Sequence, residues 1–409
     1  MNKLLSIDSR SIRRAGAPVP DRFIPRESWD QAPWNRWSFQ HVRELLPTAE
    51  VWRGAGAVAA FDHRMQDLTR VSYRFDGRES TIARFLDDNF TDGFIVLHRG
   101  VILFERYMNG MDARTLHLSQ SVGKSLTGAL CGILAGRGLI DPKAPITAYL
   151  PELEATAYRG ALVQQVLDMQ SGVAFNEEYT DPHSDIGKVD VASGWKPRPK
   201  DAAGDWPETM WQVILDLKRK DAEHGARFQY RSIETDVIAF ALERVSGLRL
   251  PELMSRELWS LLGAEESANF TLDADGYALA DGGFNAALRD YARFGQMILQ
   301  QGFFNGRQIV PAEWIASTRQ GEPEKFTGTY REGLPKGAYR QKFWIEDWQT
   351  GVLICRGVFG QLIYIDPLHD FLAVKLSSWP EFTSVARSRE ALAALHAIRQ
   401  AVTETRAGG

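Results

Sequence analysis

The segment LSQSVGKS, residues 118–125, carries a serine and a lysine three residues apart at the start of an apolar, helix-compatible run. Side chains at positions i and i+3 lie on one face of a helix, so the Lys124 amine can reach the Ser121 hydroxyl and help to remove its proton. If Ser121 opens the helix, its own N–H is a free donor that can bind the oxyanion formed during attack on a carbonyl. The segment therefore predicts a serine nucleophile with a lysine beside it.

Two other interpretations of this segment compete with a nucleophile. Residues 123–125 end like a phosphate-binding P-loop, but that motif needs a glycine where Leu118 stands, which disfavours nucleotide binding. Ser121 could also be an ordinary helix cap and Lys124 a solvated residue of the first turn. A cation is unfavourable at the positive end of a helix dipole, and this misplaced charge favours a functional role.

The composition is that of a globular protein that acts on small molecules. The 409 residues are 44% hydrophobic and 24% charged, enough for a large core and two domains, and the net charge is -4. A slightly negative net charge does not provide the excess positive charge that binds nucleic acid. No apolar run reaches the roughly 20 residues of a membrane helix. The composition therefore predicts small-molecule partners, with no nucleic-acid or membrane partner.

The cysteines and the N-terminus predict a cytoplasmic protein. Cys131 and Cys355 are the two cysteines, too few for a disulfide framework, and apolar neighbours favour core thiols although pairing stays possible. Charged residues return too early after Met1 for the apolar region of a signal peptide.

The chain divides into an arm, an α/β part and a helical part. We expect residues 1–50 to form an arm, whose aromatic stretch 33–39 packs on a neighbouring element or on a second subunit, so a homodimer is possible. Residues 94–107 resemble a β-hairpin, and further strands are expected at 352–355, 362–366 and 371–376, before a last helix at about 385–403. Both chain ends, 51–124 and 300–409, should thus form one α/β domain. Residues 125–299 should form a mostly helical domain with a substrate loop near 176–206.

A second chemical element is expected from the helical part, at Tyr230 just before a predicted helix. A phenol with a pKa of about 10 is a poor base, but a nearby lysine ammonium lowers that pKa, so Lys124 and Tyr230 make sense together. The alternative is a buried aromatic residue with a hydroxyl partner. A third element is the turn 357–361, where Gly357 would let a backbone N–H approach a substrate oxygen, although a plain strand turn also explains the glycines.

The order Ser-x-x-Lys, Tyr-x-Ser, Gly-Val-Phe-Gly resembles the penicillin-recognising serine hydrolases. More closely, the chain is similar to the 6-aminohexanoate-dimer hydrolases and their carboxylesterase relatives. The resemblance implies an α/β (α+β) fold of the β-lactamase/transpeptidase type, like class C β-lactamases, with an antiparallel sheet flanked by helices and a mostly helical domain. It runs through 29–47, 166–170, 176–182, 193–195, 228–236 and 360–380.

The resemblance implies roles for matching positions. It makes Ser121 the nucleophile, Lys124 and Tyr230 the proton-transfer pair, and the N–H groups of Ser121 and Val358 the oxyanion hole. It also points to substrate-binding residues, listed here: Tyr179 at the scissile amide, Asp190 at a free amino end, Asp281 where the closest relatives carry asparagine, and Gly357. Asp190 could instead be an ordinary exposed loop carboxylate, and Asp281 could strengthen the pull on an amine or change the preference.

Departures from the family disfavour β-lactams as substrates. The chain has Cys355-Arg356-Gly357 where β-lactamases carry Lys-Thr-Gly, so the lysine that engages a β-lactam carboxylate is absent. Arg356 could substitute for it, but its planar fork is not interchangeable with a point ammonium. We therefore expect a serine hydrolase of linear amides and short esters, with ester cleavage the easier reaction because an alcohol leaves more readily than an amine. The alternatives are a carboxylesterase without amidase activity, a β-lactamase or D-amino peptidase, and a binding protein that keeps only the fold. No cofactor is expected, and the scattered histidines predict no metal site.

Overall fold

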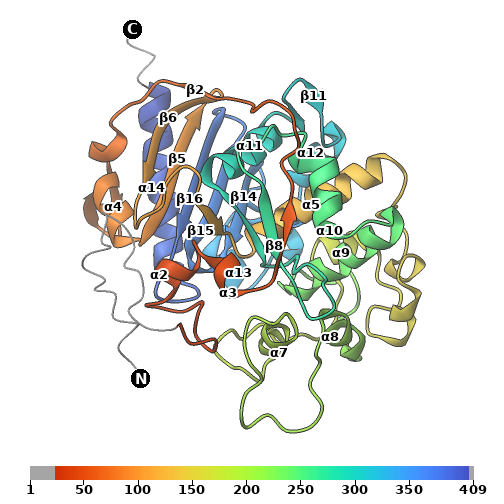
Figure 1. Cartoon of the computed structure of the whole chain (residues 1–409). Helices are drawn as coiled ribbons and strands as arrows, with labels where there is room; N and C mark the ends of the chain where they lie inside the picture. Colours follow the sequence, from red (N-terminus) through yellow and green to blue (C-terminus); the bar gives the residue numbers. More distant parts are fainter. Residues whose placement is uncertain (1–23, 405–409) are drawn as a thin grey trace.

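The computed structural model describes residues 24–404, and its largest element is an eight-stranded sheet (Figure 1). All neighbouring strands are antiparallel except β2 and β6. The strands, in spatial order, are β12 (Ala338–Arg340), β13 (Phe343–Asp347), β14 (Val352–Gly357), β15 (Gln361–Asp366), β16 (Phe371–Ser377), β5 (Thr91–His98), β6 (Val101–Tyr107) and β2 (Asp62–His63). The predicted sheet built from both chain ends is therefore confirmed.

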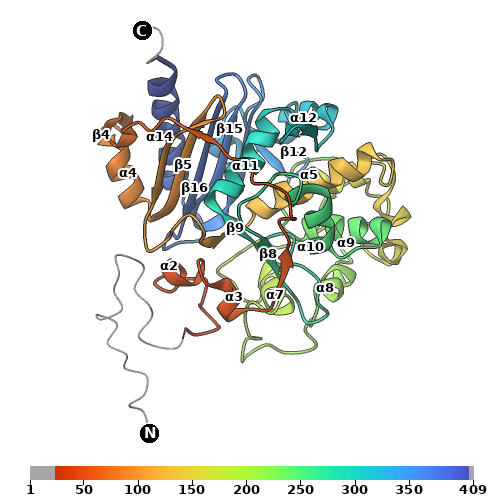
Figure 2. The same cartoon turned by 45° about the horizontal axis from the view of Figure 1, so that its top comes forward.

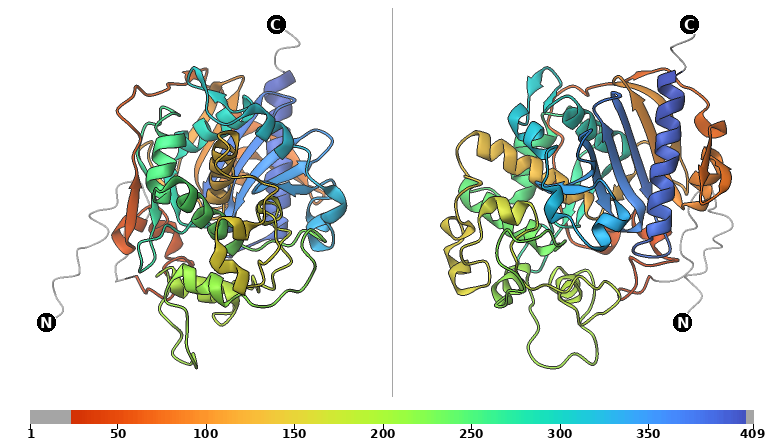
Figure 3. Two further views of the ribbon diagram at one scale, coloured as in Figure 1. Left: turned by 90° about the vertical axis from the view of Figure 1, so that its right-hand side faces the viewer. Right: turned by 180° about the vertical axis from the view of Figure 1, so that it is seen from behind.

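Helices cover both faces of this sheet because its central strands are apolar on both sides. In β5, Ile95 and Leu97 pack into the core that contains helix α11 (Leu288–Leu299), while Phe94 and Val96 face the core beneath helix α14 (Val385–Glu404). Alternate residues of a strand point to opposite faces, so the two helices lie on opposite sides of the sheet (Figures 1 and 3). The last helix covers the sheet as predicted.

A second, four-stranded sheet was not predicted. Its order is β1 (Thr48–Val51), β8 (Ala268–Thr271), β9 (Phe284–Ala287) and β7 (Leu116–Leu118), and all pairs are antiparallel. The strands β8 and β9 fall in the stretch expected to be mostly helical. The sequence does not predict them because each strand has only four residues. Both contain alanine and asparagine, which have low β-propensity. Burial of both strands holds them in place instead.

Helix α5 (Val122–Gly136) occupies the middle of the molecule between the large sheet and the helical part (Figure 2). It contacts β14 on one side and helix α9 (Ile233–Ser246) on the other. Every residue from Val122 to Leu134 is buried. The other helices are α2 (Asn35–Ser38), α3 (Val42–Leu45), α4 (Ile82–Asp88), α6 (Val163–Leu167), α7 (Asp185–Ala192), α8 (Met210–Asp216), α10 (Leu250–Met254), α12 (Ala312–Thr318) and α13 (Thr329–Gly333).

The described part of the N-terminal arm packs on its own chain. Trp29 is fully buried, its indole N–H donates to the Trp195 carbonyl at 2.9 Å, and the two rings meet edge to face at 5.2 Å. Phe39 is equally buried and contacts Phe359 at 5.2 Å. Of the two predicted settings for the aromatic stretch, the structure shows the neighbouring element. Residues 1–23 of the predicted arm lie outside the described residues.

Helix α11 belongs structurally to the α/β part. It falls within 125–299, the stretch expected to form the helical domain, yet it packs on β15 and β16 of the large sheet. Among residues 24–404, none of the helices has the length and apolar character needed to cross a membrane.

Candidate active site

Ser121 stands at the junction between strand β7 and helix α5. The N–H of Ser119 donates to the Phe284 carbonyl at 3.0 Å, which fixes the end of the strand against β9. Gln120 then adopts a φ of 52°, a left-handed conformation that is uncommon outside glycine. This turn sets Ser121 as the N-cap residue of α5, and its side chain caps no helix N–H. The serine therefore opens the helix, as predicted, with its hydroxyl free for another role.

Lys124 lies directly beside this hydroxyl. Its ammonium donates to Ser121 Oγ at 2.8 Å and to the Asp281 carbonyl oxygen at 2.5 Å, and the residue is only 1% exposed. The nitrogen also stands 5.4 Å from the centre of the Tyr230 ring. One lysine thus contacts both the serine and the tyrosine that the sequence singled out.

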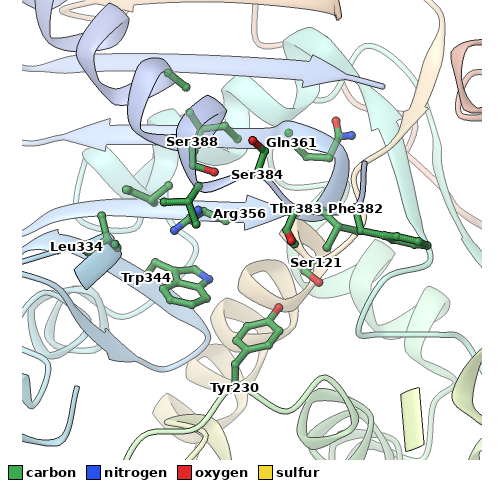
Figure 4. Close-up of a pocket in the computed structure, with 18 of the residues that line it drawn as sticks. Ser121, Tyr230, Leu334, Trp344, Arg356, Gln361, Phe382, Thr383, Ser384 and Ser388 are labelled. Atoms are coloured by element: carbon green, nitrogen blue, oxygen red, sulfur yellow. The ribbon is translucent and has the colours of Figure 1, made fainter. Parts of the chain in front are cut away.

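Tyr230 is held at the entrance to α9 by aromatic neighbours. Its ring stacks on Trp344 at 5.4 Å, and its backbone N–H donates to the Tyr330 hydroxyl oxygen at 3.1 Å. Figure 4 shows the phenol oxygen pointing toward Ser121. The structure therefore brings Ser121, Lys124 and Tyr230 together from two helices.

The pKa values of this pair differ from the expectation. Lys124 lowers the pKa of Tyr230 as predicted, but burial raises it by more, so the pKa lies above its ordinary value. Burial alone would lower the pKa of Lys124, but the nearby Tyr230 and Asp281 raise it above its ordinary value. Both groups consequently hold their protons at neutral pH.

Gly357, at the end of β14, allows the strand to pass close to the serine turn. A Cβ atom at this position would lie 2.4 Å from the Ser119 carbonyl oxygen, so only glycine fits. The next residue, Val358, lines the same cavity as Ser121 and precedes Phe359, whose φ is 59°. Within residues 24–404, neither the Ser121 N–H nor the Val358 N–H donates a hydrogen bond to another group. Both donors are available for a substrate oxygen.

A cavity of about 410 Å³ opens in front of these groups (Figure 4). Its walls are largely apolar and come from the sheet, from the segment before α14 and from the first turns of that helix. The apolar and aromatic lining residues include Tyr330, Leu334, Trp344, Ile354, Leu362, Trp379, Phe382, Val385, Ala391 and Leu392. This volume and character suit a small organic ligand.

Tyr179 lines the cavity together with a carboxylate, Glu177, that the sequence did not single out. The Tyr179 hydroxyl donates to Glu177 at 2.7 Å, and its ring stacks on Phe382 at 5.7 Å. Glu177 also accepts bonds from the N–H of Ser232 at 2.9 Å and from its hydroxyl. Glu177 is therefore oriented by three donors at the edge of the cavity.

Asp190 is not placed at the cavity. Its carboxylate pairs with Lys196 at 2.8 Å, and Lys196 also pairs with the buried Asp30 at 3.1 Å. Lys196 stands 5.4 Å from the ring of Phe382, which lines the cavity, whereas Asp190 and Lys196 themselves do not line it. An internal lysine already neutralises Asp190 in this structure, so the predicted contact of its carboxylate with a substrate amine stays a prediction without support from this geometry.

Asp281 acts through its backbone in this structure. Its carbonyl accepts from Lys124, while its buried carboxyl lies near Asp236 and does not line the cavity. Burial raises the pKa of Asp281 to about 6 despite the opposing Lys124. The carboxylates of residues 24–404, taken with their His and Cys side chains, form no group of three that could hold a metal ion.

Comparison with known proteins accounts for this arrangement. The model of the Beta-lactamase family matches residues 79–398. The chain belongs to the beta-lactamase family. It is a serine hydrolase of this family and resembles 6-aminohexanoate-dimer hydrolase.

Two relatives share most of the beta-lactamase-family chain. The 6-aminohexanoate-dimer hydrolase of Paenarthrobacter ureafaciens is 38% identical over 369 residues, which are 90% of this chain and 90% of that protein. A solved structure from Bacillus anthracis, provisionally described as a 6-aminohexanoate-dimer hydrolase, superposes with a TM-score of 0.85 at 29% identity, covering 93% of this chain and 97% of that one. A family VIII carboxylesterase is 16% identical with a TM-score of 0.58, covers 77% of this chain and 95% of its own, and shows the fold alone.

Sequence reasoning missed two features of this beta-lactamase-family cavity. Glu177 stands two residues before Tyr179, a spacing that carries no signal of a shared site. Trp344 comes from β13, more than a hundred residues after the Tyr230 ring on which it stacks. An aromatic residue in a strand normally indicates core packing, so its place at the cavity emerges only from the fold.

Proposed function

We propose that this chain hydrolyses linear amides and short esters through an acyl-enzyme on Ser121, with 6-aminohexanoate oligomers among the amides. The observation that carries the proposal is the 2.8 Å bond from Lys124 to Ser121 Oγ, in a cavity that Tyr230 also lines. The names of the relatives support the amide, and the carboxylesterase with the same fold supports the ester.

Acylation begins with attack of Ser121 Oγ on the substrate carbonyl carbon. The serine proton passes to the Lys124–Tyr230 pair, which has lost one proton beforehand, and the carbonyl electrons move onto oxygen. The N–H groups of Ser121 and Val358 stabilise that oxyanion; one such donor contributes about 10²–10³ in rate. Tyr230, whose hydroxyl points at Ser121, then returns the proton to the departing amine or alcohol.

Deacylation repeats these steps with water as the nucleophile. Water gives its proton to the same pair, attacks the acyl carbonyl and releases the acid, while Ser121 recovers its proton. Amide substrates depend more strongly on the returned proton, because an amine anion is a far worse leaving group than an alkoxide. The position of the Tyr230 hydroxyl relative to the leaving nitrogen or oxygen therefore affects the rate of amide cleavage more than the rate of ester cleavage.

The polar groups of the cavity support a linear substrate with charged ends. Glu177 is the one acidic side chain that lines the cavity within residues 24–404, and it supplies the negative charge that a free amine would meet. Tyr179, which donates to Glu177, stands beside it and could turn toward a leaving nitrogen. We propose that Glu177 binds the amine, which is the role expected of Asp190 from the sequence.

We also propose a cytoplasmic location, since Cys131 and Cys355 are both free and buried and reducing conditions keep thiols unpaired. We also keep a homodimer as a proposal without an assigned surface, because Phe39, from the aromatic stretch 33–39 that suggested it, packs within the chain.

The test of this function compares two substrates with the wild-type enzyme. We expect turnover of a p-nitrophenyl short-chain ester and, more slowly, of the linear 6-aminohexanoate dimer. Ester turnover is measured by the release of nitrophenol, and dimer turnover by the release of free amine. Cleavage of the ester alone would leave a carboxylesterase. A chromogenic cephalosporin is the control, and we expect little turnover because the Lys-Thr-Gly triplet is absent; rapid cephalosporin cleavage with an inert dimer would contradict the proposal.

The pH dependence of ester cleavage follows from the raised pKa values of Lys124 and Tyr230. Both groups are protonated at neutral pH, and the pair must lose one proton before it can accept that of Ser121. We therefore expect kcat/KM to rise from pH 7 toward pH 10, as the coupled pair deprotonates. The profile is measured with a neutral p-nitrophenyl ester, corrected for its spontaneous hydrolysis. A rate that falls over this range would show that the protonated pair is the active form.

A further inference from the structure

Arg356 is a cavity-lining arginine without an anionic partner. It lies in β14 immediately before Gly357, and its side chain makes no ion pair or hydrogen bond with any of residues 24–404. Its guanidinium carbon stands 5.2 Å from the centre of the Trp344 ring, which is the contact that holds it. A flat cation on an aromatic face keeps its outer edge free for hydrogen bonds.

Other arginines inside this protein are neutralised. Arg231 is fully buried and pairs with Asp221 at 3.1 Å, and Arg293 is fully buried and pairs with Asp290 at 2.9 Å. A charge removed from water without a partner is costly, so buried arginines are normally paired in this way. Arg356 differs from these two arginines, because it faces the cavity and has no carboxylate beside it among residues 24–404.

The surroundings of Arg356 complete a site for an anion. Figure 4 shows its guanidinium between Trp344 and Ser388, with Ser384 close by and Ser121 further along the cavity. The serine hydroxyls add hydrogen-bond donors of the kind that bind carboxylate oxygens. Apolar side chains line the remainder of the walls, and a hydrocarbon spacer would fill the space between the arginine and the nucleophile.

We propose that Arg356 anchors the terminal carboxylate of a linear substrate, whose aliphatic spacer crosses the cavity from Arg356 to the scissile carbonyl at Ser121. The planar guanidinium pairs with a carboxylate through two parallel hydrogen bonds, and Ser388 adds a third. This inference deepens the proposed function: it rests on hydrolysis at Ser121 and adds which end group the enzyme recognises. N-acyl ω-amino acids, and half-amides or half-esters of linear dicarboxylic acids, are the substrate class that fits.

Burial supports the same assignment. It lowers the pKa of Arg356 from its usual value, although a guanidinium stays charged at any physiological pH. A bound carboxylate would replace the lost hydration and relieve this cost. A neutral amide of the same shape would leave the charge uncompensated, which is the basis of discrimination.

The test measures competitive inhibition of p-nitrophenyl acetate hydrolysis by hexanoate and by hexanamide. The two inhibitors share one shape and differ in charge. In the wild type we expect the inhibition constant of hexanoate to be about 10- to 100-fold lower, the range of a charge-assisted hydrogen bond. In R356Q the ratio should fall to about one, and R356K should restore part of it, because a point ammonium forms a single bond. Because the two inhibition constants are compared within one variant, a change in the rate of ester hydrolysis does not affect their ratio.

The matched control is R389Q. Arg389 also lines the cavity but is exposed, so its loss removes the same charge from solvent and should leave the hexanoate preference within about twofold. An equal loss in R389Q and R356Q would overturn the proposal in favour of general charge attraction. A wild-type ratio near one would overturn it without recourse to a variant.

The outcome is separable from that of the proposed function. If the 6-aminohexanoate dimer is not cleaved, the inhibitor ratio still measures the anchor on ester turnover. If the ester is not cleaved either, direct calorimetric titration of wild type and R356Q with hexanoate and hexanamide gives the same ratio. If the wild-type enzyme cleaves the dimer but binds hexanoate and hexanamide equally well, the proposed reaction stands and the proposed recognition of the carboxylate end is wrong.

Discussion

Replacement of Ser121 by alanine should reduce turnover of both ester and amide by about 10⁴-fold or more, because it removes the hydroxyl on which the proposed acyl-enzyme forms. Ser121 Oγ accepts a hydrogen bond from Lys124 and caps no helix N–H, so its removal should leave the fold intact. The measurement is kcat/KM on a p-nitrophenyl ester, with mass spectrometry of a slowly deacylating ester to detect the covalent adduct, which S121A should lack.

The control for this variant is Ser125→Ala, one turn further along α5. Ser125 is buried, and its hydroxyl donates to the Lys342 carbonyl at 2.8 Å, away from the cavity. S125A should lose stability of about 1 kcal/mol, the usual contribution of a buried hydrogen bond, and keep the acyl-enzyme. Persistence of the adduct in S121A, or its loss in S125A, would contradict the assignment of the nucleophile.

The parts of this site that follow from local geometry could be predicted from the sequence. The i, i+3 spacing of Ser121 and Lys124 places both groups on one helix face, and the structure shows them in contact. The hairpin at 94–107 and the late strands could be found because they are long and rich in β-branched residues. The short strands β8 and β9 could not, since long-range pairing and burial hold them.

Electrostatic properties of the site could not be predicted, because they depend on partners that are distant in sequence. Asp190 is neutralised by Lys196, and Lys196 is shared with Asp30 from the N-terminal arm. The pKa of Tyr230 depends on how completely the surrounding side chains exclude water, and this burial outweighs the lysine. Sequence shows which charges exist, whereas the fold decides which of them are left unpaired.

Replacement of Tyr230 by phenylalanine should lower kcat by about 10²–10⁴-fold, the range of a general acid–base group, and should lower amide turnover more than ester turnover. The phenol oxygen points toward Ser121, while the ring is held by Trp344 and contributes packing that phenylalanine preserves. An ester with a good leaving group needs no protonated alcohol, so part of its rate survives. The measurement is kcat on p-nitrophenyl ester and on the linear amide, in parallel with the wild type.

Tyr339→Phe separates a chemical role of Tyr230 from the removal of any buried hydroxyl. Tyr339 packs edge-on to Tyr230 at 6.3 Å, is 3% exposed, and its hydroxyl has no hydrogen-bond partner among the described residues. Removing that unsatisfied hydroxyl should leave kcat within about twofold and cost no stability, since a buried donor without a partner is itself unfavourable. Equal losses in Y339F and Y230F would assign the effect to packing of the aromatic cluster. A large loss confined to Y230F, and greater for the amide, would show that the phenol carries the proton to the leaving group.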